Sequence, residues 1–206
     1  MNEPLLFSLI TFAFLTTITP GPNNLMVMSS VMLFGVKRTL PHMFGIQFGF
    51  SILMVAGVLG LGELLVYFPW AHLFVQWAGA GWLCWLGLSF LKEAFRQHTS
   101  QSNKAPKKTN RPFYFFEAAL FQWANPKALI LVLSSAGLYI DIADDIFVRT
   151  IVMVLVFVLV GLPCSFTWML VGRTLNHWLG EASHGRVINI IMALLIFGLV
   201  AVILLN

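Results

Sequence analysis

Long apolar runs separated by short polar stretches make up most of this chain. Six such runs extend over residues 5–36, 44–68, about 70–91, 113–140, 146–171 and 187–205. The hydrocarbon core of a bilayer is about 30 Å thick, so a helix of about 20 apolar residues can cross it. The pattern therefore predicts an all-α, polytopic membrane protein with six transmembrane helices.

The first apolar run contains a segment that cannot remain helical. Residues 19–24 read Thr-Pro-Gly-Pro-Asn-Asn, and the first charged residue after them is Lys37. Proline lacks a backbone N–H, clashes with the carbonyl four residues earlier and restricts the residue before it. Backbone groups freed at membrane depth must be buried in protein or line a polar cavity. We therefore expect a broken helix 1 and a binding site at its break.

A second mid-span proline, Pro126, interrupts the fourth run. Each break is followed by an apolar stretch and then by a serine pair, at residues 29–30 and 134–135. Paired interruptions in the two halves of a chain are typical of inverted-repeat transporters that bind substrate between the repeats. We therefore predict two inverted three-helix repeats, residues 1–91 and 113–206, joined by a linker at residues 92–112, with helices 1 and 4 broken by proline.

The charged residues are few, and their distribution predicts an orientation. Charged residues are 10% of the chain and hydrophobic residues 59%, whereas a soluble domain is about one quarter charged. The loops after helices 1, 3 and 5 would carry ten of the twelve basic residues, and the opposite side only Arg149. Basic loops remain in the cytoplasm. Both termini should therefore lie outside and the linker inside.

The remaining basic residue, Lys127, follows Pro126 and is expected near the membrane midplane. A buried lysine needs a partner, and that partner is either a substrate carboxylate or Glu117. These two residues are ten positions apart, roughly 15 Å along a continuous helix, so a direct pair is not expected. Burial and a helix N-terminus both disfavour the ammonium charge. Lys127 and Glu117 are therefore the proton-coupling candidates.

Polar and backbone groups near the two breaks form the predicted substrate site. The half-helix beginning after Pro22 presents backbone N–H groups that favour an anion. Neutral amides and hydroxyls nearby could bind the rest of a zwitterion, although each could equally form an interhelical hydrogen bond or a helix cap. The predicted set is Thr19, Pro20, Gly21, Pro22, Asn23, Asn24, Gln47, Gln122, Asn125, Pro126 and Lys127.

Other functional classes lack the residues they need. No aspartate is expected at membrane depth, and all five histidines, His42 included, are expected in loops or at interfaces. This disfavours a metal site. The sequence contains neither paired carboxylates nor a serine motif, so it does not suggest an enzyme. The basic linker lacks the interleaved aromatic residues of a nucleic-acid site. No cofactor is expected. A cation or metal carrier and a non-transporting membrane partner protein remain as alternatives.

Three motifs resemble the LysE/RhtB family of amino-acid exporters. They are residues 19–24, the Trp-Ala-Gly-Ala-Gly-Trp segment at 77–82 with Leu86, and Asn-Pro-Lys-Ala at 125–128. The resemblance covers the whole chain and implies proton-driven export of a small amino acid or derivative across the bacterial inner membrane. The paired asparagines and Phe121-Gln122 are most similar to members that export cysteine and O-acetylserine, followed by homoserine and threonine exporters. A homo-oligomer is compatible with the sequence. Only the resemblance indicates the direction of transport.

Overall fold

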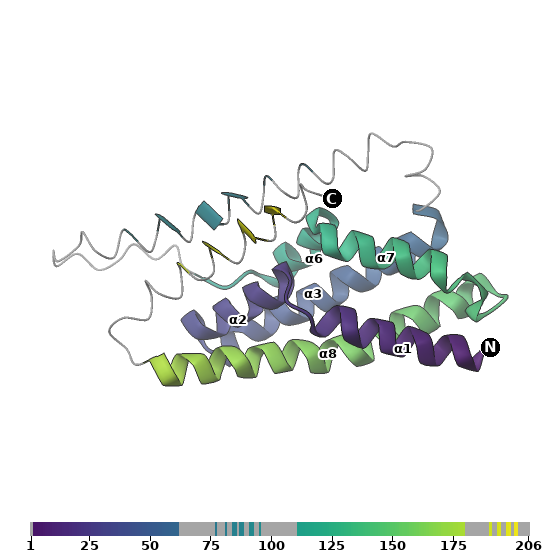
Figure 1. The fold of residues 1–206 in the computed structure, drawn as a ribbon, viewed down its shortest axis with the longest axis horizontal. Helices are drawn as coiled ribbons and strands as arrows, with labels where there is room; N and C mark the ends of the chain where they lie inside the picture. The colour runs from purple at the N-terminus through teal and green to yellow at the C-terminus, as the bar shows by residue number, and fades with distance from the viewer. Residues whose placement is uncertain are drawn as a thin grey trace.

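The computed structural model of the chain describes residues 2–61 and 111–179, with scattered positions between 77 and 95 and between 190 and 201. The regular structure in these ranges is helical. The predictions for helix 3, the linker up to residue 110 and helix 6 concern mainly residues outside this part. The elements, shown in Figure 1, are α1 (Glu3–Ile18), α2 (Pro22–Phe34), α3 (Val36–Ala56), η1 (Gly57–Leu61), α6 (Phe115–Ala124), α7 (Pro126–Leu138), η2 (Ile140–Ile142) and α8 (Ile146–Leu179).

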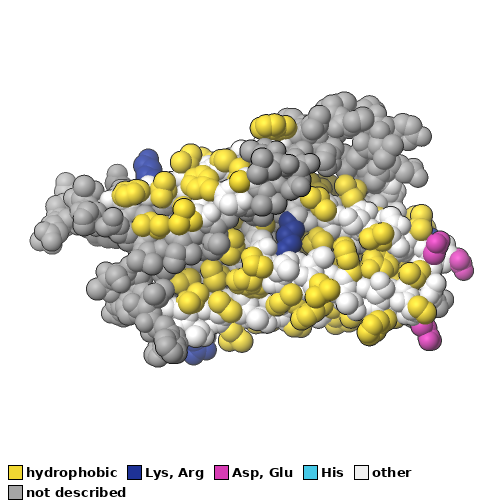
Figure 2. All heavy atoms as spheres, in the orientation of Figure 1, with side chains coloured by type: hydrophobic (Ala, Val, Ile, Leu, Met, Phe, Trp, Pro, Cys, Tyr) yellow, Lys and Arg dark blue, Asp and Glu magenta, His cyan; other side chains and the backbone are white. Residues whose placement is uncertain are grey.

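Helix length and surface composition fit a bilayer. Residues Val36–Gly60 and Ile146–Leu175 are each long and apolar enough to span it, and α1 with α2 form a third such unit that is bent by 50°. Large apolar side chains face outward, for example Phe7 at 74%, Phe116 at 72% and Leu159 at 69% exposure. Figure 2 shows hydrophobic side chains across the described part of one face, with acidic side chains gathered at one end. Such a surface is stable only against lipid or protein.

Both predicted helix breaks are confirmed. Between α1 and α2, Gly21 has an extended backbone and Pro22 is the first residue of α2, where its missing N–H breaks no helical hydrogen bond. Between α6 and α7, Asn125 is also extended, and its Oδ1 accepts a hydrogen bond from Lys127 N at 3.2 Å. Both α2 and α7 therefore start in the same way, with an extended residue followed by proline.

The two halves of the chain pack against each other in a crossed manner. The broken pair α1–α2 packs on the long helix α8, whereas α6 and α7 pack on the long helix α3. A shared apolar core joins α1, α3, α7 and α8. It includes one residue of each in turn: Leu9, Leu53, Val132 and Met153. Each half therefore needs the other half to bury its apolar faces.

Glycines set how closely these helices approach. A Cβ added at Gly45 or Gly49 of α3 would collide with backbone atoms of Phe115 or Ala119 in α6. On the other side of the molecule, a Cβ at Gly172 of α8 would lie 2.6 Å from the Met28 carbonyl oxygen of α2. The Gly45-x-x-x-Gly49 spacing therefore allows α3 to approach α6 closely.

His42 does not lie in a loop, which is one of the two positions expected for it. Gly35 ends α2 with a φ of 80°, and α3 begins at the next residue rather than near Phe44. His42 therefore lies within α3, where it is 2% exposed, and its ring packs 5.4 Å from that of Phe113. Neither ring nitrogen has a hydrogen-bond partner within the described residues.

Candidate functional site

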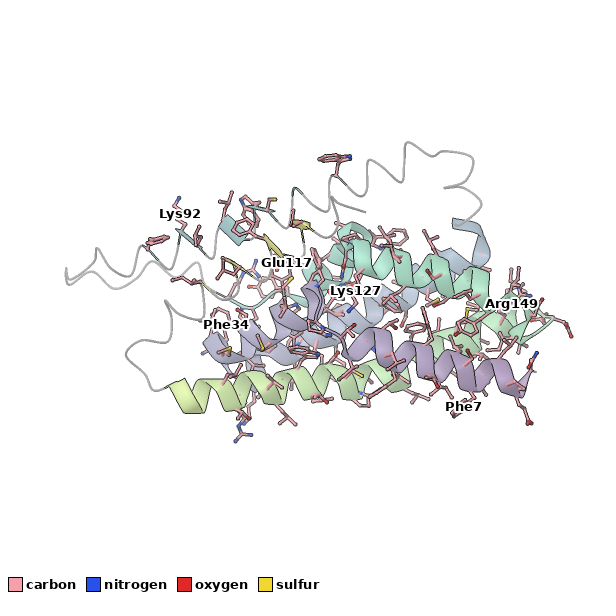
Figure 3. All side chains as sticks on the ribbon, viewed as in Figure 1. Phe7, Phe34, Lys92, Glu117, Lys127 and Arg149 are labelled. Atoms are coloured by element: carbon pink, nitrogen blue, oxygen red, sulfur yellow. The ribbon has the colours of Figure 1, made fainter. Side chains whose placement is uncertain are left out.

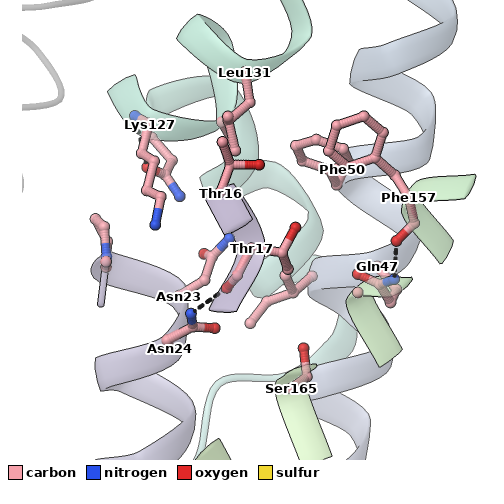
Figure 4. A pocket seen from close by; sticks show the side chains of 16 residues that line it. Thr16, Thr17, Asn23, Asn24, Gln47, Phe50, Lys127, Leu131, Phe157 and Ser165 are labelled. Carbon is pink, nitrogen blue, oxygen red and sulfur yellow. Dashed lines mark hydrogen bonds between the residues drawn. The ribbon is translucent and has the colours of Figure 1, made fainter. Parts of the chain in front are cut away.

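A small cavity lies where the two helix breaks meet (Figure 4). Its volume is about 50 Å³, which is room for only a few water molecules. An amino acid would therefore enter only if the surrounding side chains moved. The cavity is lined from α1, α2, α3, α7, α8 and the two breaks, by Thr16, Thr17, Gly21, Pro22, Asn23, Asn24, Ile46, Gln47, Phe50, Asn125, Lys127, Ala128, Leu131, Phe157, Gly161 and Ser165.

Lys127 connects the second break to the first. Figure 3 shows it near the middle of the molecule's length, between Phe34 toward one end and Arg149 toward the other. Its ammonium donates to the Thr19 carbonyl at 3.0 Å, to Thr19 Oγ1 at 2.9 Å and to the Pro20 carbonyl at 3.3 Å. These acceptors lie at the C-terminal end of α1, where the helix dipole favours a cation. The favourable dipole at this end of α1 offsets the unfavourable one that Lys127 meets beside the N-terminus of α7.

Side chains also satisfy the other carbonyls that the first break leaves free. Thr19 Oγ1 donates to the Thr16 carbonyl at 2.8 Å. Asn24 Nδ2 donates to the Thr17 carbonyl at 2.7 Å, and Trp168 Nε1 donates to the Ile18 carbonyl at 3.0 Å. A second bond from Asn24 Nδ2 reaches the Thr19 carbonyl at 2.9 Å. Helix ends at membrane depth need such partners because lipid provides none. Asn24 therefore supports the end of α1 rather than capping α2, whose N-cap is Gly21.

Gln47 extends from α3 to α8 across the cavity wall. Its Nε2 donates to the Phe157 and Val158 carbonyls, each at 3.3 Å. Gly161 makes this possible, because a Cβ there would lie 2.7 Å from the same nitrogen. The close approach of α3 and α8 at this point therefore depends on Gly161.

Most of the predicted substrate-binding set meets at this cavity. Gly21, Pro22, Asn23, Asn24, Gln47, Asn125 and Lys127 line it. Three further members bond to lining residues: Thr19 and Pro20 accept from Lys127, and the buried Gln122 bonds to Asn23. Pro126 begins α7 between two lining residues.

Glu117 is not among the residues that line this cavity. Its carboxylate forms a two-pronged ion pair with Arg111, at 2.7 and 2.8 Å, and accepts from the Tyr114 backbone N–H at 2.9 Å. The hydrogen bond to Glu117 raises the pKa of Arg111 above its ordinary value. Glu117 thus belongs to the first turn of α6, and it forms no hydrogen bond or ion pair with Lys127 in the described structure.

Several lining residues were not predicted. Thr16, Thr17, Ile46, Phe50, Ala128, Leu131, Phe157, Gly161 and Ser165 complete the cavity. Two of them could have been identified from the sequence, since Gly161 and Ser165 are small residues on either side of Pro163 within an apolar run. The apolar members have no such signal, because a lining phenylalanine resembles any other apolar residue of a membrane helix.

Metal-ligand clusters are not found in the described ranges. Within residues 2–61 and 111–179 and the scattered positions, no three His, Cys, Asp or Glu side chains come together as metal ligands. Lys127 is the charged residue among those that line the cavity. The lining is otherwise made of neutral hydroxyls, amides and apolar groups.

A protein-family model and several relatives each match most of this chain. The family model described as LysE type translocator matches residues 14–206. A cysteine/O-acetylserine efflux protein of Escherichia coli O1:K1 / APEC is 26% identical over 198 residues, which is 95% of each chain. Proteins of the same description from Escherichia coli (strain K12) and Shigella sonnei (strain Ss046) are 24% identical over 95% of each chain. No solved structure gives a significant match.

Proposed function

This chain belongs to the LysE family of translocators, and we propose that it exports a small amino acid or amino-acid derivative from the bacterial cytoplasm, coupled to protons. It is a membrane transport protein and not an enzyme. The observation that carries the proposal is that two proline breaks, 104 positions apart between Pro22 and Pro126, line one cavity that contains Lys127.

The proposed substrate position follows from the charges around the cavity. The first turn of α2 presents backbone N–H groups of Asn23 and Asn24, and the Lys127 ammonium lies close to Gly21 on the same side. A helix N-terminus and a lysine together favour a carboxylate. We place the substrate carboxylate between them, with neutral groups around the remainder of the molecule.

The relatives suggest which amino acids to test first. Those compared above are described as cysteine/O-acetylserine efflux proteins. We propose cysteine or O-acetylserine as the substrate of this chain also. The small cavity supports this choice, because a bulky side chain would require a larger rearrangement than a small one.

Proton coupling is assigned to Lys127 because its present partners are exchangeable. Its ammonium is held by neutral carbonyl and hydroxyl oxygens of the first break, not by a carboxylate. A substrate carboxylate would be a stronger partner for the ammonium than these neutral acceptors. When substrate leaves, the lysine can return to the carbonyls or lose its proton, so the protonation state of Lys127 changes with substrate occupancy.

The proposed topology has six spans in two inverted repeats, with both termini outside. The crossed packing of the broken pairs on α3 and α8 supports this arrangement, because two inverted repeats would pack in this reciprocal way. The charges at the helix ends support the orientation. The acidic residues Asp141, Asp144 and Asp145 lie in and after η2, at the end opposite to the helix termini that carry Lys37, Arg38, Arg111 and Arg173.

Transport in inverted membrane vesicles tests the proposal. Vesicles that contain the protein should accumulate radiolabelled cysteine or O-acetylserine when a pH gradient is imposed, and accumulate little after the gradient is collapsed. Vesicles with the Gly21→Leu variant provide the matched control. Accumulation of no amino acid from a panel of twenty, with protein present in the membrane, would contradict export.

A further inference from the structure

Ser165 of α8 lacks the backbone hydrogen bond that many hydroxyls in membrane helices form. Such hydroxyls commonly bond to the carbonyl four residues earlier, and the same helix shows this for Thr150 at 2.7 Å and for Thr167 at 2.9 Å. Ser165 forms no hydrogen bond within the described residues, although it is only 6% exposed. It lines the cavity, and Figure 4 shows its hydroxyl directed into it. A hydroxyl that faces a cavity without a protein partner is available to a ligand or to water.

Gln47 offers a complementary group on the same wall. Its nitrogen is bonded to two carbonyls of α8, so the orientation of its amide is fixed. Its oxygen, Oε1, has no hydrogen-bond partner in the part of the chain that the structure describes. In Figure 4, Gln47 and Ser165 lie on the side of the cavity away from Lys127. One end of the cavity thus carries a positive charge, and the side away from it carries a free acceptor and a free hydroxyl.

We propose that Gln47 Oε1 and Ser165 Oγ form the subsite for the substrate side chain and select a side chain that carries a hydroxyl or thiol. Such a group can donate to Gln47 Oε1 and accept from the Ser165 hydroxyl, so both unpartnered groups are satisfied at once. An ester or other purely accepting group can satisfy Ser165 only and leaves Gln47 Oε1 without a donor. Between the two substrates proposed above, the subsite therefore favours cysteine over O-acetylserine.

The surroundings define what this subsite rejects. The rings of Phe50 and Phe157, 5.2 Å apart between centroids, pack together at the same wall and restrict the length of a side chain. No charged residue accompanies Gln47 and Ser165 among the residues that line the cavity there. An acidic or basic substrate side chain would consequently be desolvated without a counterion, which is unfavourable. This subsite rests on the proposed transport function and makes it more specific.

Binding of isosteric amino acids to purified protein tests the subsite. L-Serine and L-2-aminobutyrate differ by a hydroxyl in place of a methyl group, and L-cysteine is the thiol counterpart. Wild-type protein should bind L-cysteine and L-serine about tenfold more tightly than L-2-aminobutyrate, since hydrogen bonds in a buried site give preferences of about this size. Ser165→Ala and, independently, Gln47→Met should bring the three affinities within about twofold. Ligand-dependent thermal unfolding in detergent provides the affinities, and unfolding without ligand shows that each variant is folded.

Ser135→Ala is the matched control. Ser135 is as buried as Ser165, but its hydroxyl bonds to the Leu131 carbonyl at 2.7 Å and it does not line the cavity. This variant should keep the tenfold preference. Equal binding of the three ligands by wild type, or an unchanged preference in both Ser165→Ala and Gln47→Met, would overturn the subsite and leave amino-acid transport standing. Failure of any amino acid to bind or be transported would instead remove the proposed function, and the subsite with it.

Discussion

The side-chain amides of Asn23 and Gln122 form two reciprocal hydrogen bonds that join the two helix breaks. Asn23 Nδ2 donates to Gln122 Oε1 at 2.8 Å, and Gln122 Nε2 donates to Asn23 Oδ1 at 3.1 Å. Gln122 also donates to the Ala118 carbonyl of its own helix at 2.9 Å. The start of α2 is therefore fixed to the end of α6 by a pair of neutral groups. A neutral link can open and re-form at membrane depth at lower cost than an ion pair.

The coupling between these amides can be measured with a double-mutant cycle. Asn23→Leu and Gln122→Met keep side-chain size and remove the hydrogen bonds, so each single variant should destabilise the protein by leaving its partner unpaired. The double variant should be less destabilised than the sum of the two. We expect a coupling energy of about 0.6–1.7 kcal/mol, the range for hydrogen bonds between membrane helices. Unfolding in mixed micelles gives the values, and strict additivity would show that the pair contributes nothing.

Gly21 is expected to tolerate no large side chain. A Cβ at this position would lie 2.7 Å from Lys127 Cδ and 3.0 Å from its Nζ. Gly21→Leu should therefore displace the lysine from the Thr19 and Pro20 carbonyls and abolish transport, while the protein still inserts into the membrane. Gly21→Ala should retain part of the activity, because the flexible lysine side chain can shift. Transport assays in inverted vesicles, normalised to protein level, distinguish these outcomes.

Gly137 provides the control for Gly21. It also lies in a helix of a broken pair, but a Cβ added there meets no atom within 4 Å in the described structure. Gly137→Leu should consequently transport at close to the wild-type rate. If Gly21→Leu and Gly137→Leu transported equally well, the space at the first break would have no role.

A substitution at Gly49 tests the packing of α3 against α6 rather than substrate transport. The atoms that a Cβ at Gly49 would meet belong to the backbone of Ala119, which cannot rotate away. Gly49→Ala should therefore separate α3 from α6 and lower the free energy of unfolding by about 1–3 kcal/mol. Gly137→Ala should change it in the opposite direction, by up to about 1 kcal/mol, since alanine favours a helix over glycine. Equal effects of both substitutions on thermal unfolding would contradict the close α3–α6 contact.

The proposed orientation can be tested with thiol labelling. In a background with Cys84 and Cys164 replaced by alanine, a cysteine at Ser102 in the basic linker should react with a membrane-impermeant reagent only after the cells are permeabilised. A cysteine at Asp144, in the loop between η2 and α8, should react in intact cells. The opposite pattern would invert the topology, and labelling of both sites from outside would rule out the six-span arrangement.

The helix breaks could be predicted because their causes are local. Proline and glycine act on the residues next to them in any context, so the breaks before Pro22 and at Asn125 followed from the sequence alone. Two glycines four positions apart, Gly45 and Gly49, are visible in the sequence as a spacing that permits close helix packing, but only the fold shows that α6 is the partner. The start of α3 was misplaced because the apolar pattern begins near Phe44, whereas the helix begins directly after Gly35.

The partners of Lys127 and Glu117 could not be predicted in the same way. The acceptors of Lys127 are mainly backbone carbonyls of Thr19 and Pro20, and every residue type has such a carbonyl. Only the tertiary fold brings these residues, more than 100 positions away, to the lysine. Glu117 lies within the fourth apolar run of the sequence, but Arg111 lies close enough to pair with it at the start of α6. The free hydroxyl of Ser165 could not be predicted for a similar reason, since its missing hydrogen bond is a property of the folded helix.

Lys127 and Glu117 can be separated as proton-coupling residues by matched substitutions that remove charge. Glu117→Gln removes an ion pair that is exposed to solvent and outside the cavity lining, so the pH dependence of substrate binding should remain that of wild type. Lys127→Met removes the ammonium that we propose binds the substrate carboxylate, so affinity should fall at least tenfold and lose its pH dependence. Binding by purified protein between pH 5 and pH 9 measures both. A loss of pH dependence in Glu117→Gln alone would transfer the coupling role to Glu117.

Lys127→Arg distinguishes a positive charge from an exchangeable proton. Arginine remains protonated at every accessible pH and its planar group requires more space than an ammonium. If Lys127 only attracts the carboxylate, Lys127→Arg should bind and transport at rates close to wild type. If Lys127 releases its proton in each cycle, the variant should bind substrate but fail to accumulate it under a pH gradient, although it can still exchange labelled for unlabelled substrate. We expect the second result, because the neutral carbonyls that hold Lys127 in the empty site oppose deprotonation less than a carboxylate would. Gradient-driven accumulation by Lys127→Arg at the wild-type rate would show that the proton travels by another residue.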